Sequence, residues 1–254
     1  MSSLSFTYTC SAIALLLAPI EAGADAHGDY RRYCATCHGA RGDGRGPTAA
    51  LLAPRPRDFT TGAFKFRSTP SGALPTDRDI LLVVTQGLRG TSMTGWRDVL
   101  SYQRRRALVD VVKGFSPRFR SEPVPPPLVL PQPTPNDAGT IARGREVYRR
   151  MKCAECHGRG ARGDGPSVPT LVDDGGQPIV PSDLTRRDLV RRRSTWQMMR
   201  VMYTGLNGTP MPSYADVIEP AESWDLVRFL VSLQRCSPWT SFFTDPPLVW
   251  RGRR

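Results

Sequence analysis

The sequence is poor in several residue types on which other folds and functions depend. Its 254 residues include three histidines, His27, His38 and His157, and lysine accounts for three of its 35 basic residues. Stretches with the alternating pattern of a β-strand are scarce. The sequence therefore predicts an all-α fold, and its 23 glycines and 24 prolines indicate long loops. The scarcity of histidine also limits which residues can bind a metal.

The charge is mostly of one sign. There are 35 Lys and Arg residues against 23 Asp and Glu residues, which gives a formal net charge of +12. Such an excess is compatible with an acidic protein partner, an anionic membrane or nucleic acid, and also with a merely solvated arginine-rich surface. The densest runs, Arg104–Arg106 and Arg191–Arg193, are not interleaved with aromatic residues as in nucleic-acid modules. We therefore expect no nucleic-acid binding.

No apolar run is long enough to cross a membrane. The run near the N-terminus, Ser11–Ile20, is shorter than the ~20 residues that a spanning helix needs, and small residues follow it. This pattern predicts a cleaved signal peptide at 1–24 and export to the periplasm, although no Lys or Arg precedes the run. The alternative is an uncleaved anchor that keeps the protein at the membrane. We expect Cys10 to leave with the signal peptide and Cys236 to remain as a buried or free thiol without a partner.

Two short segments, CATCHG at 34–39 and CAECHG at 153–158, belong to a long internal repeat. The corresponding segments keep nearly the same offset: Cys34 with Cys153, Asp58–Thr60 with Asp183–Thr185, Gly87–Met93 with Gly205–Met211, and Leu108 with Leu226. A repeat this long, with insertions confined to its middle, implies two copies of one domain.

The domain boundaries follow from the repeat. We expect the first domain at 25–120 and the second at 138–236, joined by SEPVPPPLVLPQPTPND at 121–137. Seven residues of this segment are proline, which predicts an extended, semi-rigid linker. A tail at 237–254 has no counterpart in the first half.

Apolar periodicity and glycine stops predict three helices in each domain. They are Asp29–Cys34, Asp77–Gln86 and Arg104–Phe115 in the first domain, and Arg143–Cys153, Thr195–Thr204 and Glu222–Leu233 in the second.

Each repeat contains Cys-x-x-Cys-His, the attachment site of c-type haem. Two thiols at this spacing can each add to one vinyl group of the porphyrin, and the imidazole that follows lies under the iron as an axial ligand. The pattern thus predicts covalent attachment and iron ligation by these residues: Cys34, Cys37 and His38, and Cys153, Cys156 and His157. A redox dithiol and half a zinc site are the alternatives, but zinc needs further Cys or His ligands, which the second domain lacks.

The second axial ligand has to come from elsewhere, because histidine is nearly exhausted. Methionine is the other common ligand of such an iron. Met93 and Met211 occupy matched positions, each in a Gly-Thr-x-Met segment with an aromatic residue three positions later. We therefore expect both to be ligands rather than core filler. Three further methionines compete for the ligand role in the second domain: Met198, Met199 and Met202. They lie on a predicted helix, and we expect them to pack against the porphyrin instead. His27 is expected to be exposed.

Pro47 and Pro166 each follow their motif histidine by nine residues. We predict that a backbone carbonyl in this loop accepts the Nδ1–H of the proximal imidazole and fixes its orientation. The alternative is a plain turn proline without such a role.

With these features the sequence resembles class I c-type cytochromes over residues 27–235. The shared features are a helix that leads into Cys-x-x-Cys-His, a glycine loop with a proline, and a late methionine before a C-terminal helix. Two such units with a linker resemble the tandem dihaem cytochromes c of bacteria. The resemblance implies two covalently bound haem c groups, one ligated by His38 and Met93 and the other by His157 and Met211, attached outside the cytoplasm.

Two filled axial positions leave no coordination site for a substrate. We therefore expect an electron-transfer protein rather than an enzyme: a carrier, or an electron-transfer subunit of a periplasmic or membrane-associated respiratory chain, whose partners are redox proteins with acidic surfaces. Two alternatives stay open. One is an enzyme similar to bacterial dihaem peroxidases, which needs one iron that opens to peroxide. The other is a cytochrome subunit docked on a larger oxidoreductase.

Overall fold

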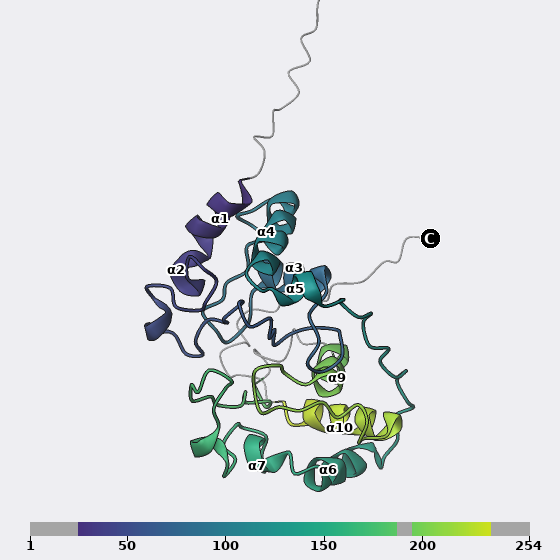
Figure 1. Cartoon of the computed structure of the whole chain (residues 1–254). Coiled ribbons are helices and arrows are strands. Elements are labelled where there is room, and N and C mark those ends of the chain that lie inside the picture. Colours follow the sequence, from purple (N-terminus) through teal and green to yellow (C-terminus); the bar gives the residue numbers. More distant parts are fainter. Residues whose placement is uncertain (1–24, 187–194, 235–254) are drawn as a thin grey trace, which may run out of the picture.

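The computed structural model describes residues 25–186 and 195–234, and the regular structure of these residues is helical (Figure 1). Their β-structure is limited to an isolated antiparallel bridge between Val172 and Pro178. The predicted all-α fold is therefore confirmed. None of the described helices is both long enough and apolar enough to cross a membrane. The expected signal peptide, the tail and Cys236 lie outside the described residues.

The helices occur in the same order in both halves of the chain. The first unit contains α1 (Ala26–Tyr33), α2 (Ala35–His38), η1 (Ala49–Leu51), α3 (Asp77–Gln86), α4 (Tyr102–Gly114) and α5 (Arg118–Ser121). The second unit contains α6 (Thr140–Arg150), α7 (Ala154–His157), η2 (Val168–Thr170), α9 (Thr195–Thr204) and α10 (Pro220–Ser232). This order agrees with two copies of one domain.

Local chemistry decides where the helices begin and end. The Asp25 side chain accepts a 2.8 Å hydrogen bond from Gly28 N and so starts α1 three residues before the predicted start. Thr76 and Asp79 form a capping box at the start of α3, and this helix ends at Gly87, whose φ is +69°. The cysteine motif is a separate short helix in each unit, not the end of the preceding one.

The core of the first unit lies where α1 and α3 pack against α4. Tyr30 from α1, Ile80 from α3 and Val109 from α4 are all buried in one apolar cluster. At the edge of this cluster the Arg104 guanidinium donates two hydrogen bonds to the nearly buried Asp29 carboxylate. The ion pair fixes α1 against α4.

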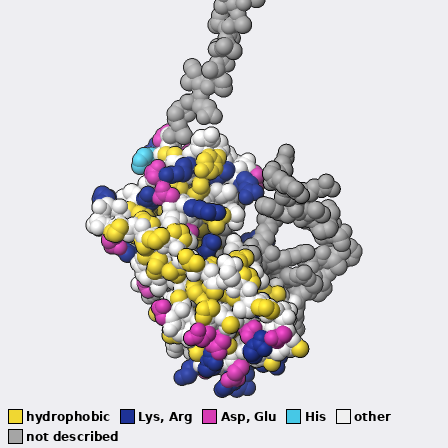
Figure 2. Space-filling view, turned by 90° about the vertical axis from the view of Figure 1, so that its right-hand side faces the viewer, with side chains coloured by type: hydrophobic (Ala, Val, Ile, Leu, Met, Phe, Trp, Pro, Cys, Tyr) yellow, Lys and Arg dark blue, Asp and Glu magenta, His cyan; other side chains and the backbone are white. Residues whose placement is uncertain are grey.

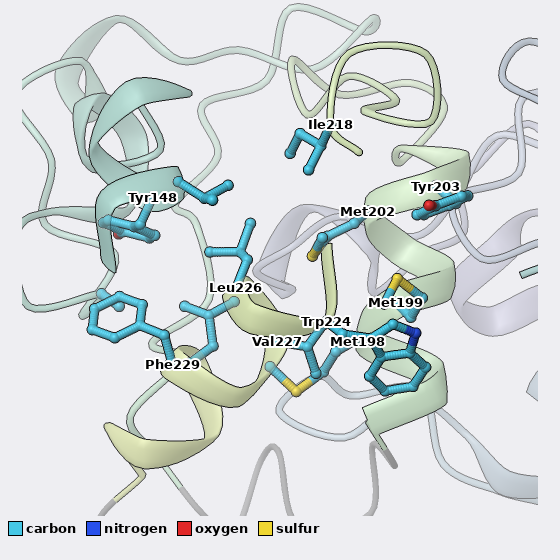
Figure 3. Close-up of a cluster of buried hydrophobic side chains, with 13 residues drawn as sticks. Tyr148, Met198, Met199, Met202, Tyr203, Ile218, Trp224, Leu226, Val227 and Phe229 are labelled. Carbon is cyan, nitrogen blue, oxygen red and sulfur yellow. The ribbon is translucent and has the colours of Figure 1, made fainter. Parts of the chain in front are cut away.

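The core of the second unit lies between α6, α9 and α10 (Figure 3). Helices α6 and α10 approach closely at Gly144, where an added Cβ would lie 2.1 Å from the Asp225 carbonyl oxygen. Beside this crossing Arg143 Nε donates to the Asp225 carboxylate at 2.6 Å. The ring of Tyr148 packs edge-on against Phe229, with centroids 5.6 Å apart. Only glycine at 144 permits this helix spacing.

The chain between the two units forms no helix or strand and is hydrogen-bonded to both of them. Leu128 N donates to Ser68 O of the first unit at 2.8 Å. Trp224 Nε1 of the second unit donates to Pro131 O at 3.1 Å. In Figure 1 this segment runs from α5 to α6 along the outside of both units.

The two units also touch directly. Arg67 is 2% exposed and donates from Nη2 to Thr204 O at 2.5 Å. Asn207 accepts from Gly72 N at 3.0 Å and donates to Ala73 O at 3.3 Å. All of these contacts reach residues 204–207 of the second unit, at the end of α9 and the start of the loop that carries Met211.

Candidate haem-binding sites

In each unit the two cysteines and the histidine of the motif lie on one turn. His38 N donates to Cys34 O at 2.9 Å, and His157 N donates to Cys153 O at the same distance. All four motif cysteines are free, so neither pair is closed by a disulfide. The motif turns are therefore alike in the two units.

The environment of the thiols does not favour a redox dithiol. Burial, together with the charges of Asp29 and Cys37, raises the pKa of Cys34 to about 11. Burial likewise raises the pKa of Cys153 to about 11. A catalytic dithiol needs a lowered pKa instead. The described residues also contain no group of three or more His, Cys, Asp or Glu side chains arranged to hold a metal ion, as a zinc site would require.

The His38 side chain is held so that one ring nitrogen stays available to a metal. Its Nδ1 donates to the carbonyl oxygen of Arg57 at 3.1 Å, and its ring stacks on Phe59 with centroids 4.4 Å apart. Burial lowers the pKa of His38, and the Arg57 carbonyl partly opposes this. The imidazole is therefore neutral near pH 7, with its proton on Nδ1 and Nε2 free to bind iron.

The second unit places Ser182 where the first unit has Arg57. Burial lowers the pKa of His157, and the Ser182 carbonyl opposes this effect. Nδ1 of His157 is buried and makes no hydrogen bond of normal geometry. The carbonyl is thus near the ring but less well aligned than in the first unit.

These acceptors correct one prediction. We placed the carbonyl acceptor in the loop that contains Pro47 or Pro166, and this is wrong for the first unit, where Arg57 provides it. The acceptor segment lies ten residues beyond Pro47, and in the second unit Ser182 takes the corresponding place.

The loop around each proline is instead bonded to the motif turn. The backbone N–H groups before and after Pro47 donate to the carbonyls of Cys37 and Thr36, at 3.1 Å each. The same two bonds form around Pro166, at 3.2 and 2.9 Å. Proline fits between two such donors because it has no N–H of its own. A contact of either proline with haem remains a prediction.

A tyrosine on the preceding helix also holds each motif turn, and sequence reasoning missed it. Tyr30 Oη donates to Gly39 O at 2.9 Å, and Tyr148 Oη donates to Gly158 O at 2.7 Å. The signal was present, because a tyrosine precedes the first cysteine by four residues in one unit and five in the other. The extra residue is accommodated at Lys152, which has a φ of +54°.

The two methionines expected as ligands are presented by loops of the same construction. Leu88 N donates to Met93 O at 2.8 Å, and Thr91 Oγ1 donates to Leu88 O at 2.7 Å while it accepts from Met93 N at 3.1 Å. The second unit repeats these bonds at 3.1, 2.7 and 3.3 Å among Leu206, Thr209 and Met211. The threonine of Gly-Thr-x-Met thus shapes the loop.

The aromatic residue three positions after each methionine lies against the motif. The Trp96 ring contacts that of Tyr33, next to Cys34, with centroids 5.2 Å apart. Burial raises the pKa of Tyr214 to about 12, and the two motif thiols of the second unit are close enough to add to this effect. Each methionine loop is therefore folded onto the cysteine motif of its own unit.

The three methionines that compete with Met211 for the ligand role lie on α9, and the apolar cluster that contains them also packs against Cys153 and Tyr214. Met198, Met199 and Met202 are buried in the apolar cluster of the second unit (Figure 3). Their predicted contact with the porphyrin stays untested. His27 is exposed, as expected.

Comparisons with known proteins agree with this geometry. Residues 21–110 match the family described as cytochrome c oxidase, cbb3-type, subunit III, and residues 141–234 match the family described as cytochrome c. A chain of the Kuenenia stuttgartiensis reducing HAO-like protein complex Kustc0457/Kustc0458 is 39% identical over 83% of this chain and 96% of its own length, with a TM-score of 0.79. The chain belongs to the cytochrome c family. It carries two class I cytochrome c domains in tandem, which imply two covalently bound haem c groups. The comparison with curated proteins gives no match.

The residues of this cytochrome fit the haem that the family carries. Each unit offers two free thiols and a neutral imidazole on one turn. Nη1 of Arg67 is buried without a hydrogen-bond partner. It would be available to donate to an anionic group such as a carboxylate of haem. When bound, haem supplies one-electron chemistry at iron, and the protein supplies ligands and a low-dielectric surrounding.

Proposed function

We propose that this cytochrome is a periplasmic electron-transfer subunit in which each iron is held between one histidine and one methionine. The observation that carries the proposal is the identical construction of the Met93 and Met211 loops, each folded onto the motif that contains His38 or His157. A methionine ligand raises the reduction potential and closes the sixth position of the iron. A closed position serves electron transfer rather than substrate binding.

The similarity of the two units also separates this function from that of a dihaem peroxidase. A peroxidase needs one iron that opens to peroxide, so its two haem sites have different roles. Here the motif turns, the tyrosines that hold them and the methionine loops are repeated in both units. These shared features give no reason to assign a peroxide site to one unit rather than the other.

A redox protein is the natural partner of such a cytochrome. The similar solved chain belongs to a protein complex, which supports a subunit role for this chain as well. The first domain (25–120) has 17 Lys and Arg residues against eight Asp and Glu residues, whereas the second (138–236) has 15 against 11. Figure 2 shows acidic and basic side chains mixed at the lower end, where the second unit lies. We propose that an acidic partner docks on the first unit.

Ligand exclusion tests the closed coordination. The mature holoprotein, oxidised and reduced, is titrated with cyanide and with hydrogen peroxide while its absorption spectrum is followed. We expect two low-spin haems per chain, no rapid spectral change of the oxidised protein with either reagent and no peroxide turnover. Rapid cyanide binding at one haem would contradict the proposal.

Ionic strength tests the charged partner. We expect the rate of reduction by an acidic redox protein to fall steeply as salt rises from low to physiological concentration, because salt screens exposed charges. A basic redox protein of similar potential is the control and should show no such fall. Equal rates at all salt concentrations would contradict docking through charge.

A further inference from the structure

Arg57 contacts the machinery of both haem sites. Its backbone carbonyl accepts the hydrogen bond from His38 Nδ1 in the first unit, at 3.1 Å. Its guanidinium lies on Gly208 of the second unit, so close that a Cβ added there would be 2.3 Å from Nη1 of Arg57. One residue thus joins the proximal histidine of one site to the methionine loop of the other.

Gly208 belongs to the turn that presents Met211. This turn is closed by the bond from Leu206 N to Met211 O, and Gly208 has a φ of +76° within it. The carbonyl of Gly208 accepts from Asp174 N at 3.3 Å. Two contacts therefore restrict this loop at Gly208: the guanidinium of Arg57 and the hydrogen bond from Asp174 N.

The arginine is partly buried, and its charge is balanced from the second unit. Burial lowers the pKa of Arg57, while the charges of Asp173, Asp174 and Asp58 oppose this. Two of these three acids come from the second unit. An arginine stays charged at all ordinary pH values, and this guanidinium lies at the boundary between the two units.

The arrangement is not repeated in the other direction. The residue that corresponds to Arg57 is Ser182, whose carbonyl acts on His157 but whose short, exposed side chain carries no charge. The corresponding positions therefore share the backbone role and differ in the side chain. A substitution of the Arg57 side chain therefore leaves its backbone carbonyl in place, and a substitution of Ser182 is the matched control.

We propose that Arg57 is a positioning residue that couples the two haem sites, with its side chain fixing the Met211 loop and its charge raising the reduction potential of the second site. The inference rests on the proposed methionine ligation. A nearby cation favours the reduced iron, which carries less positive charge. A restricted loop keeps the Met211 sulfur bound to the iron.

The test uses the mature holoprotein with Arg57→Gln, Arg57→Lys and the control Ser182→Ala. Two-step redox titrations are recorded together with the weak red charge-transfer band of methionine-ligated ferric haem, and Met211→Leu identifies the step of the second site. With Arg57→Gln we expect this step to shift to lower potential and its band to weaken, while the first site, held by the Arg57 backbone, changes less. Arg57→Lys keeps the charge, so the potential of the second site should stay closer to that of the wild type than in Arg57→Gln. Ser182→Ala should change neither redox step.

If Arg57→Gln folds poorly, a double-mutant cycle between Arg57→Ala and Gly208→Ala tests the same contact. Gly208→Ala displaces the guanidinium, so its effect on the second step should be smaller in an Arg57→Ala background than in the wild type. Additive effects, or an Arg57→Gln protein whose second step is unchanged, would overturn the coupling. If the wild type lacks two methionine-ligated haems, the proposed function itself fails, so the two failures are distinct.

Discussion

The hydroxyl group of Tyr30 donates a 2.9 Å hydrogen bond to the carbonyl oxygen of Gly39 and so holds the end of the haem-binding turn against α1. Both groups are buried, and burial raises the pKa of this tyrosine, which stays a donor at all ordinary pH values. Tyr148 and Gly158 repeat the bond in the second unit. The tyrosine is thus part of the construction of each haem site.

Replacing this tyrosine tests its role. Tyr30→Phe removes one of the two hydrogen bonds to the Gly39 carbonyl, which keeps the bond from Gly42 N at 3.1 Å. We therefore expect the free energy of unfolding to fall by about 0.5–1.5 kcal/mol. Chemical denaturation of the holoprotein measures the loss. Tyr102→Phe is the control, because Tyr102 is 59% exposed and should change little. Equal stability of both variants would show that the bond contributes nothing.

Gly144 tests the helix crossing of the second unit. An alanine Cβ would lie 2.1 Å from the Asp225 carbonyl, so Gly144→Ala has to push α6 and α10 apart. We expect a loss of about 1–3 kcal/mol of stability in thermal or chemical unfolding. Gly114→Ala, at the end of α4, is the matched control because no atom lies within 4 Å of its added Cβ. A tolerated Gly144→Ala would mean that the helices cross differently.

The ion pair between Arg104 and Asp29 predicts a pH dependence. The hydrogen bonds from Arg104 lower the pKa of Asp29 below its ordinary value. The pair therefore stabilises the fold at pH values above the ordinary pKa of about 3.9, and this stability is lost as the pH falls through the lower pKa of the folded state. Asp29→Asn should be less stable at neutral pH and should lose less stability on acidification. Unfolding curves from about pH 7 to about pH 2 measure this, with the exposed Asp98→Asn as control. Parallel curves for all three proteins would contradict the assignment.

Local sequence signals predicted much of the architecture. The repeat placed matching helices in both halves, and glycines such as Gly87 marked helix ends because a positive φ is needed there. Helix starts were less predictable. The prediction for α1 began at Asp29, but the capping side chain of Asp25 sets the start earlier, and apolar periodicity does not report a cap.

Contacts between distant segments were the part that the sequence did not reveal. The acceptor for His38 is a backbone carbonyl, and every residue has one, so residue type cannot point to Arg57. The prediction placed the acceptor in the loop of Pro47 instead, because proline is a recognisable residue at a matched position in both units. Arg57 and Gly208 lie in different units. The repeat predicts the structure within each unit and does not predict contacts between the units. By contrast, the methionine loops could be anticipated because their pattern occurs twice.

Counting the methionine-ligated irons tests the central claim most directly. The red charge-transfer band of the ferric holoprotein is measured per haem in the wild type, Met93→Leu, Met211→Leu and the double variant, with the core substitution Met202→Leu as control. The account predicts about half the band in each single variant, none in the double variant and a full band in the control. A double variant that keeps the wild-type band, with both haems attached, would contradict it.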